Sequence, residues 1–340
     1  MKKNIISIGA GIILFTLLYT AVQLYAPLPI GNKNIEIQIP AGATFRQAAE
    51  IFESAHAIRN KTFFLAVGRL TGTDRKIRAG YYSIYKSMNL LDLFRILRKG
   101  QIIEYAITIV EGDSLREISQ KLVDKDIVSK DDFMELATDE GYLSAYDIDA
   151  PSLEGYLFPD TYRIPKGMDP DEVIGMMINK MREKFSGKLR ARAAEIDMSE
   201  RDVLTLASII EKEAIIDKDR PLISAVYHNR LKKKMLLQAD PTTIYGVKSS
   251  RERITFKDLR RKTAYNTYII KGLPPGPIAS PGLKSIIAAL YPARVPYLYF
   301  VSNNDCTHHF SVTAREHLAA VRAYREKKEM EKLQMKEADG

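Results

Sequence analysis

The stretch "SERDVLTLASIIEKEA", residues 199 to 214, has the pattern of an amphipathic helix that ends in a charged turn. Ser199 is a typical N-cap residue, and the acidic residues after it suit the positive end of a helix dipole. At about 100° per residue, the apolar side chains from position 203 to 214 share one face. The stretch therefore predicts a helix that packs on a core and carries three charged residues in its last turn: Glu211, Lys212 and Glu213.

The two glutamates of this turn differ in their expected place on the helix. Lys212 falls nearly opposite the apolar stripe, Glu211 lies roughly 100° from its centre, and Glu213 lies roughly 60° from it. Since Glu213 lies closer to the apolar stripe, we expect it to be the buried one if either carboxyl is partly buried. Burial would raise its pKa, and a carboxyl that stays protonated near neutral pH can act as a general acid. The alternative is that both glutamates are solvated, or that one pairs with an arginine or lysine.

Upstream of this helix, two segments resemble each other. "IQIPAGATFRQAAEIFESAHAIRNKTFF", from residue 37 to 64, and "ITIVEGDSLREISQKLVDKDIVSKDDF", from residue 107 to 133, align at Gly42 and Gly112. Each predicts a short strand, a glycine turn and a helix, with Thr44 or Ser114 as the N-cap. Such strand-helix units resemble LysM modules, which bind N-acetylglucosamine polymers. A spacer that only separates a second domain from the membrane is the alternative interpretation.

The amino terminus has the pattern of a membrane anchor. Residues 5 to 26 carry no charge, and as a helix they would reach roughly 33 Å, enough for the hydrocarbon core. A cleavable signal peptide is the alternative, but the apolar run is long and lacks a small-residue cleavage site. Lys2 and Lys3 precede the run, so we expect a cytoplasmic amino terminus and an extracytoplasmic remainder.

Composition narrows the possible partners. The chain has 340 residues, 46% of them hydrophobic, which suits a folded protein of more than one domain. One cysteine excludes an internal disulfide framework and a zinc-site spacing. The net charge of +9 favours an anionic partner, such as anionic lipid or a cell-wall polymer. No recognition helix or RNA-binding aromatic pattern accompanies this charge, so nucleic acid is not expected.

The predicted fold class is α+β, with a single transmembrane helix, a LysM-like strand-helix region and a mixed α+β catalytic domain. Beyond residue 153 the sequence predicts helices at about residues 170 to 196, 199 to 214, 224 to 234 and 282 to 290, and a strand in "PYLYFVSN". The expected domains are residues 1 to 27 (cytoplasmic tip and anchor), 34 to 140 (LysM-like region), 150 to 325 (catalytic domain) and 326 to 340 (charged tail).

Five motifs together resemble one protein family. They are "LEGYLFPDTY", "ASIIEKEA", "QADPTTIYG", "AYNTY" and "GLPPGPIASPG", and with the single anchor they resemble the YceG-like endolytic murein transglycosylases, the MltG family. The likeness covers about residues 35 to 330. It implies that Glu213 is the catalytic residue, because the catalytic glutamate of the family falls at this position of the helix motif.

The resemblance implies cleavage of the bond between N-acetylmuramic acid and N-acetylglucosamine in peptidoglycan, leaving a 1,6-anhydro end. One carboxyl would act first as acid and then as base, with no metal and no cofactor. It also implies that the enzyme ends the polymerisation of nascent strands, and it makes contact with wall synthases plausible. The expected location is the cytoplasmic (inner) membrane, crossed once, with the catalytic domain outside. Candidate substrate-binding residues are Glu211, Gln238, Asp240, Thr242, Asn266, Thr267 and Tyr268.

Two other functions stay open. A muramidase would hydrolyse the same bond with Asp160 or Asp240 activating water, although Asp160 is more typical of a structural hydrogen-bonding residue. A membrane-anchored scaffold that binds the cell wall without cutting it is the second alternative. His308 and His309 are adjacent and do not form a metal site, so we expect them at the margin of the site or in the core.

Overall fold

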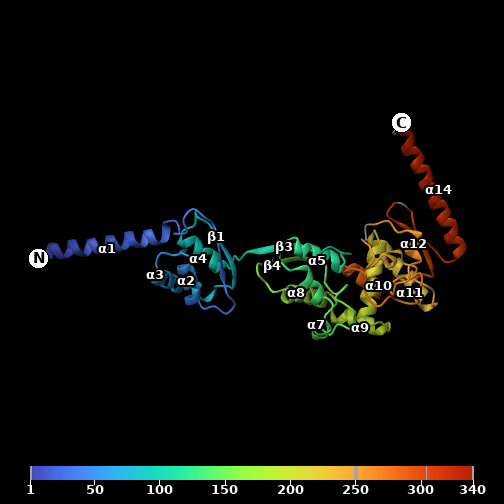
Figure 1. Ribbon diagram of the computed structural model, residues 1–340, viewed down its shortest axis with the longest axis horizontal. Helices are drawn as coiled ribbons and strands as arrows, with labels where there is room; N and C mark the ends of the chain where they lie inside the picture. The colour runs from blue at the N-terminus through green and yellow to red at the C-terminus, as the bar shows by residue number, and fades with distance from the viewer. Residues whose placement is uncertain (1, 249–251, 304, 339–340) are drawn as a thin grey trace. The chain divides into compact units, whose positions relative to one another are not determined.

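The structure, a computed structural model, describes residues 2 to 248, 252 to 303 and 305 to 338 of the chain. The chain folds into two compact units (Figure 1). Unit 1 comprises Met1–Ala106 with Arg163–Met168, and unit 2 comprises Ile107–Tyr162 with Asp169–Gly340. Helices and short strand pairs occur in both units, so the fold is mixed α+β, as the sequence predicts.

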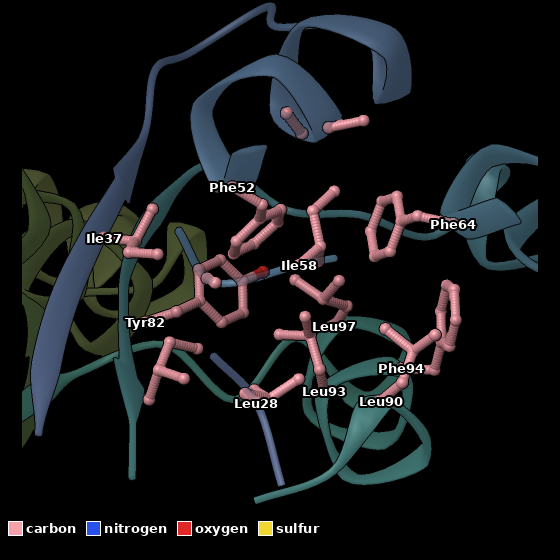
Figure 2. Packing of buried hydrophobic residues seen from close by; sticks show 14 of the residues in the cluster. Leu28, Ile37, Phe52, Ile58, Phe64, Tyr82, Leu90, Leu93, Phe94 and Leu97 are labelled. Carbon is pink, nitrogen blue, oxygen red and sulfur yellow. The ribbon is translucent and has the colours of Figure 1, made fainter. Parts of the chain in front are cut away.

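Unit 1 is built on an antiparallel strand pair. β1 (Ile35–Ile39) pairs with β2 (Gly80–Ile84), with Ile37 opposite Tyr82. Figure 2 labels Tyr82 and Phe52 among the side chains of the buried cluster on which this sheet packs. The helices that supply the rest of the cluster alternate apolar and polar residues at helical spacing. They are α2 (Phe45–Ser54), α3 (Lys61–Leu70) and α4 (Leu90–Lys99), with the short 3₁₀ turn η1 (Thr73–Arg75) between them.

The first helix, α1 (Lys2–Tyr25), belongs to unit 1. Its segment Ile6–Tyr25 has a mean hydropathy of 1.8 and is long and apolar enough to cross a membrane, which is evidence from length and composition alone. Large apolar side chains on it, such as Phe15, are exposed.

Unit 2 contains most of the helices and the charged turn quoted above. β3 (Glu104–Thr108) and β4 (Thr161–Pro165) pair with each other, and each has residues in both units. The strands that lie wholly in unit 2 are the antiparallel pair β5 (Tyr299–Ser302) and β6 (His308–Ser311). The helices are α5 (Leu115–Val123), α6 (Lys130–Leu136), α7 (Glu140–Ala145), α8 (Pro170–Lys184), α9 (Gly187–Glu195), α10 (Glu200–Glu213), α11 (Arg220–Lys232), α12 (Phe256–Leu259), α13 (Leu283–Leu290) and α14 (Ala314–Ala338). Two 3₁₀ turns, η2 (Asp217–Asp219) and η3 (Asp240–Thr243), complete the unit.

The two similar segments have the local structure that their sequences predict. Gly42 and Gly112 both lie in the left-handed region, with φ of +73° and +84°, where a side chain would be strained. Thr44 and Ser114 are the N-caps of α2 and α5, and both helices begin with a capping box. The first segment lies in unit 1 and the second in unit 2.

One predicted helix is interrupted. The sequence predicts a single helix over about residues 170 to 196, whereas α8 ends at Lys184 and α9 begins at Gly187. Phe185 is fully buried between the two helices, and Ser186 then begins α9. Burying the Phe185 ring changes the chain direction, and an apolar pattern at helical spacing does not reveal such a break.

Candidate active site

The helix α10, labelled beside α11 in Figure 1, packs mainly on α13 and α11. Its last turn carries the three charged residues that the sequence singles out. Ser199 is its N-cap and forms a capping box with Asp202, which fixes where the helix begins. The buried side chains from Val203 to Ile210 leave little freedom to rotate the helix about its axis. Each residue of the last turn therefore has a fixed direction, and each contacts a different partner.

Glu211 forms a buried ion pair. Its Oε1 lies 2.9 Å from Nη1 of Arg220, and both side chains are under 10% exposed. Its Oε2 accepts a hydrogen bond of 2.9 Å from the backbone amide of Gly282. Glu211 therefore matches the alternative that the sequence left open, in which one glutamate pairs with an arginine, and its carboxyl is buried as well. The helix wheel counts only neighbours on α10, whereas α11 and the loop before α13 cover this carboxyl.

Lys212 contacts a third segment. Its Nζ donates a hydrogen bond of 3.2 Å to the carbonyl oxygen of Gly112, in the turn before α5. The left-handed conformation of Gly112 brings the backbone close to the lysine stem, which lies 3.6 Å from the position of an added Cβ. The first two charged residues of the turn thus fasten α10 to two loops and are satisfied within the protein.

Glu213 differs from both. Oη of Tyr227, on α11, donates a hydrogen bond of 3.4 Å to its Oε1, and the side chain keeps part of its surface open to solvent. Burial, and after it the nearby negative charge of Asp240, raises the pKa of Glu213 to about 8. Hydrogen bonds from Tyr227 and the Asp240 backbone, together with the charge of Arg230, act in the opposite direction. The carboxyl is therefore mostly protonated at neutral pH and can give up its proton.

Arg230 is a buried cation beside this carboxyl. Its Nε donates a hydrogen bond of 2.7 Å to the carbonyl of Leu298, and its Nη1 donates one of 2.7 Å to the carbonyl of Leu237. Its guanidinium lies over the ring of Tyr299, 5.2 Å from the centroid. Because its hydrogen bonds go to neutral carbonyls, the positive charge stays available to the carboxylate of Glu213.

Asp240 and Tyr268 form the other side of the site. Oη of Tyr268 donates a hydrogen bond of 2.6 Å to Oδ1 of Asp240, and both residues have exposed surface. Gln238 is exposed and adopts a left-handed conformation with φ of +48°, which is uncommon for a residue with a side chain. Among the predicted substrate-binding residues, these three keep exposed surface, and the charges of Asp240 and Glu213 act on each other.

Three other predicted substrate-binding residues are fully buried: Thr242, Asn266 and Thr267. Oγ1 of Thr267 accepts a hydrogen bond of 2.9 Å from the amide of Ala239 and lies 2.9 Å from Oγ1 of Thr242. Nδ2 of Asn266 donates to backbone carbonyls at residues 258, 259 and 261, and Oδ1 of Asn266 accepts from the amide of Tyr268. In this structure these side chains hold the loops that carry Asp240 and Tyr268.

The remaining acids and histidines have structural partners. Asp160 accepts a hydrogen bond of 2.8 Å from the amide of Thr161 through its side chain, as expected for a structural residue. Nδ1 of His308 lies 2.9 Å from Oδ2 of Asp219, and both side chains are buried, whereas His309 is exposed. Within the described ranges, no three His, Cys, Asp or Glu side chains gather closely enough to hold a metal ion.

Sequence reasoning missed Glu154, which is only 3% exposed. Its carboxyl accepts hydrogen bonds from the amide of Leu115, at the start of α5, and from Oη of Tyr245. Burial raises the pKa of Glu154 to about 7. Glu154 lies in the motif "LEGYLFPDTY" and Tyr245 in "QADPTTIYG". An acid within an aromatic stretch is a signal of burial, and a buried carboxyl needs a hydrogen-bond donor such as Tyr245.

The fold and these motifs place the chain in a known family. A sequence profile of the YceG-like family matches residues 37–323, and the chain belongs to this family. It is 32% identical over 321 residues to the endolytic murein transglycosylase of Bacillus subtilis, covering 89% of this chain and 88% of that protein.

Two further comparisons agree with this family. The chain is 29% identical over 311 residues to the endolytic murein transglycosylase of Streptococcus pneumoniae, where it spans 81% of its own length and 56% of the relative. A crystal structure of a yceG-like protein from Listeria monocytogenes matches with a TM-score of 0.59 and 33% identity. That match covers 84% of this chain and 98% of the other.

Proposed function

We propose that this chain is an endolytic murein transglycosylase, a lyase that cuts glycan strands of peptidoglycan between N-acetylmuramic acid and N-acetylglucosamine. The observation that carries the proposal is Glu213, at the end of α10, because burial raises the pKa of its carboxyl to about 8 while the residue as a whole is only half-buried. Such a group is protonated when a sugar arrives and can act as a general acid at neutral pH. The names of the B. subtilis and S. pneumoniae relatives support the same reaction.

In the first step, the proton of Glu213 passes to the oxygen that links the two sugars. The bond between this oxygen and C1 of the muramic acid breaks, and the N-acetylglucosamine leaves with a free hydroxyl. Positive charge develops on the muramic ring, and the ionised carboxylate of Asp240, next to Glu213, stabilises that charge. Glu213 is left as a carboxylate, which Arg230 and the hydroxyl of Tyr227 stabilise.

In the second step, the same carboxylate acts as a base. It takes the proton from the C6 hydroxyl of the muramic acid, whose oxygen bonds to C1 and closes the 1,6-anhydro ring. Glu213 is protonated again, and no water is consumed. The rise in pKa through burial and Asp240 keeps Glu213 protonated before the first step and makes its carboxylate a stronger base in the second. The decrease in pKa through Arg230 and Tyr227 favours transfer of the proton in the first step.

The side chains around Glu213 divide into two groups in this proposal. Gln238 and Asp240 are exposed, Tyr268 is half-buried, and in this proposal all three contact sugar hydroxyl or acetamido groups. The buried residues Thr242, Asn266 and Thr267 position these side chains through hydrogen bonds, and Glu211 fixes the end of α10 through Arg220.

The test is product analysis with purified full-length protein and its Glu213→Gln variant on isolated glycan strands. Mass spectrometry should find anhydro ends with the wild type, and the variant should lose about 10²-fold or more of the rate. Wild-type protein that leaves strands intact, or a variant that cuts them as fast, would exclude this proposal.

A muramidase is the second candidate, and the carboxylate of Asp240 beside Glu213 is the observation that favours it. Two carboxyl groups close to each other are what glycosidases use to activate water or form a covalent intermediate. Reducing ends that carry one added water would identify this reaction. An Asp240→Asn variant would then lose the hydrolytic product.

For the location, we infer that α1 anchors the chain once in the cytoplasmic membrane with its amino terminus inside. The apolar length of Ile6–Tyr25 and the lysines before it support this orientation. Residues 34 to 140 would act as a LysM-like wall-binding region or as a spacer, and residues 150 to 325 would form the catalytic domain. Nascent peptidoglycan would be the substrate and cell-wall synthases possible partners, with cleavage ending polymerisation. Protease protection in sealed vesicles tests the orientation.

A further inference from the structure

A basic surface lies next to the site of Glu213. The short helix α12 directs Phe256, Lys257 and Arg260 outward, and the Phe256 side chain is 81% exposed. These three residues and Arg261 line a shallow hollow of about 510 Å³. Lys257 and Arg260 form no ion pair with any residue in the described parts of the chain. We call these four residues the α12 surface.

The acid of α12 does not neutralise this surface. Asp258 is buried, and its carboxyl lies 2.6 Å from Nζ of Lys248 and 2.8 Å from Nη2 of Arg261. The hydrogen bonds from Lys248 and Thr255 lower the pKa of Asp258, so it stays ionised and paired on the inner side of the helix. The charges of Lys257 and Arg260 on the outer side are therefore left for a partner.

Hydrogen bonds fix the α12 surface relative to the candidate active site. Asn266 donates to backbone carbonyls of and after α12, including that of Asp258, and accepts from the amide of Tyr268. Tyr268 in turn donates to Asp240, whose charge acts on Glu213. A long substrate that occupies the site therefore has the α12 surface within reach.

We propose that the α12 surface binds the carboxylates of the peptide stems that murein carries on its muramic acid residues. This inference rests on the proposed function, because it concerns the same substrate. Exposed cations next to an aromatic ring match a peptide with several carboxylates and apolar side chains, and Arg260 can bind a carboxylate through two hydrogen bonds. In a stem-bearing strand the lactyl carboxyl of each muramic acid is bound in an amide, so the carboxylates that these cations can meet are those of the stems. Removal of the stems leaves one lactyl carboxylate on each muramic acid, close to the sugar ring and without the apolar peptide that the Phe256 ring would contact. The surface thus selects strands that bear stems over strands from which an amidase has removed them.

The experiment separates binding from cleavage. Full-length protein in detergent, carrying Glu213→Gln so that strands stay intact, is titrated with stem-bearing strands and with amidase-stripped strands. The double variant Lys257→Ala with Arg260→Ala should bind stem-bearing strands about three- to tenfold more weakly, as expected for two exposed charge contacts. Its affinity for stripped strands should stay within about twofold of the parent protein.

A matched control removes two exposed cations elsewhere in unit 2, Lys188 and Arg325, by alanine substitution. This control should bind both kinds of strand as the parent does, which separates a local contact from the loss of net charge. An Arg260→Lys variant that keeps part of the discrimination supports a charge contact. Equal losses on both kinds of strand, or no loss at all, would overturn the proposal.

Anionic lipid is the other anion that a basic and aromatic surface can meet. Hydrogen exchange of residues 253 to 262 is therefore measured with stem-bearing strands, and separately in nanodiscs of phosphatidylglycerol or phosphatidylcholine. Protection by the strands supports the proposal. Protection by phosphatidylglycerol and not by the strands would assign the surface to the membrane instead. Binding and hydrogen exchange of the Glu213→Gln variant are measured without turnover. These results therefore test the α12 surface independently of whether the wild type cleaves the strands.

Discussion

The hydroxyl of Tyr227 lies 3.4 Å from Oε1 of Glu213, and the hydrogen bond joins α11 to the last turn of α10. The ring of Tyr227 also packs edge-to-face on Phe300 of β5, 5.9 Å between centroids, so the hydroxyl has little freedom to move. A buried donor held at one oxygen of a titratable carboxyl affects when that carboxyl loses its proton.

Tyr227→Phe removes this hydroxyl and keeps the ring. The hydrogen bond lowers the pKa of Glu213, so without it the pKa should rise and the alkaline limb of the cleavage rate should move to higher pH, by less than about one unit. A lower maximal rate is also expected, because the carboxylate formed in the first step loses a donor. The measurement is the rate of strand cleavage from pH 5 to 9. An unchanged alkaline limb would contradict a role for Tyr227 at Glu213.

Asp240→Asn should move the same limb in the other direction. The negative charge of Asp240 raises the pKa of Glu213, so the neutral amide should lower that pKa, by about one unit. The activity should then decrease at a lower pH than in the wild type. The control is Tyr227→Phe, measured over the same pH series. A general loss of structure would not move the alkaline limb to lower pH in one variant and to higher pH in the other.

Glu211→Gln should affect stability more than chemistry. It leaves the buried guanidinium of Arg220 without its nearest carboxylate, and we expect the free energy of unfolding to decrease by about 2 to 4 kcal/mol. The matched control is Glu183→Gln, since the Glu183 side chain is 61% exposed and its loss should cost less than about 1 kcal/mol. Urea denaturation measures both. The expected difference fails if the two variants unfold at the same urea concentration.

The buried carboxyl of Glu154 gives a pH-dependent prediction for stability. Its pKa is about 7 in the folded protein against 4.5 ordinarily, so the folded state holds a proton that the unfolded state has lost between these values. This contribution to stability is full below about pH 4.5 and is lost as the pH rises to 7.

Tyr245→Phe removes a hydrogen bond that lowers this pKa, so the loss of stability should continue above pH 7. The variant should be destabilised by about 1 kcal/mol more at pH 8.5 than at pH 5, as measured by urea denaturation at each pH. A difference between variant and wild type that is the same at both pH values would show that Glu154 does not titrate in this range.

Local patterns were sufficient to predict where α2, α5 and α10 begin. Ser199, Thr44 and Ser114 begin helices as predicted, because an N-cap depends on neighbours within four residues. The period of apolar residues likewise predicted the buried face of α10 from Val203 onward. These features need no information about the rest of the fold.

Contacts between distant segments could not be predicted in this way. Glu211 is buried by Arg220 and by Gly282, which lies 71 residues further along the chain. Glu154 is buried by the amide of Leu115 and by Tyr245, which lies 91 residues further along. A helix wheel contains none of these partners, so the sequence pattern can suggest a half-buried position and cannot identify what covers it.

The last turn of α10 makes the length of this helix unusually hard to change. Adding or deleting one residue before Glu211 would rotate the turn by about 100°. Arg220, the carbonyl of Gly112 and Tyr227 would then each face the wrong side chain. Homologous chains can therefore vary their surface loops in length. Selection should remove insertions and deletions within this helix, because only one rotation of the last turn brings all three side chains to their partners.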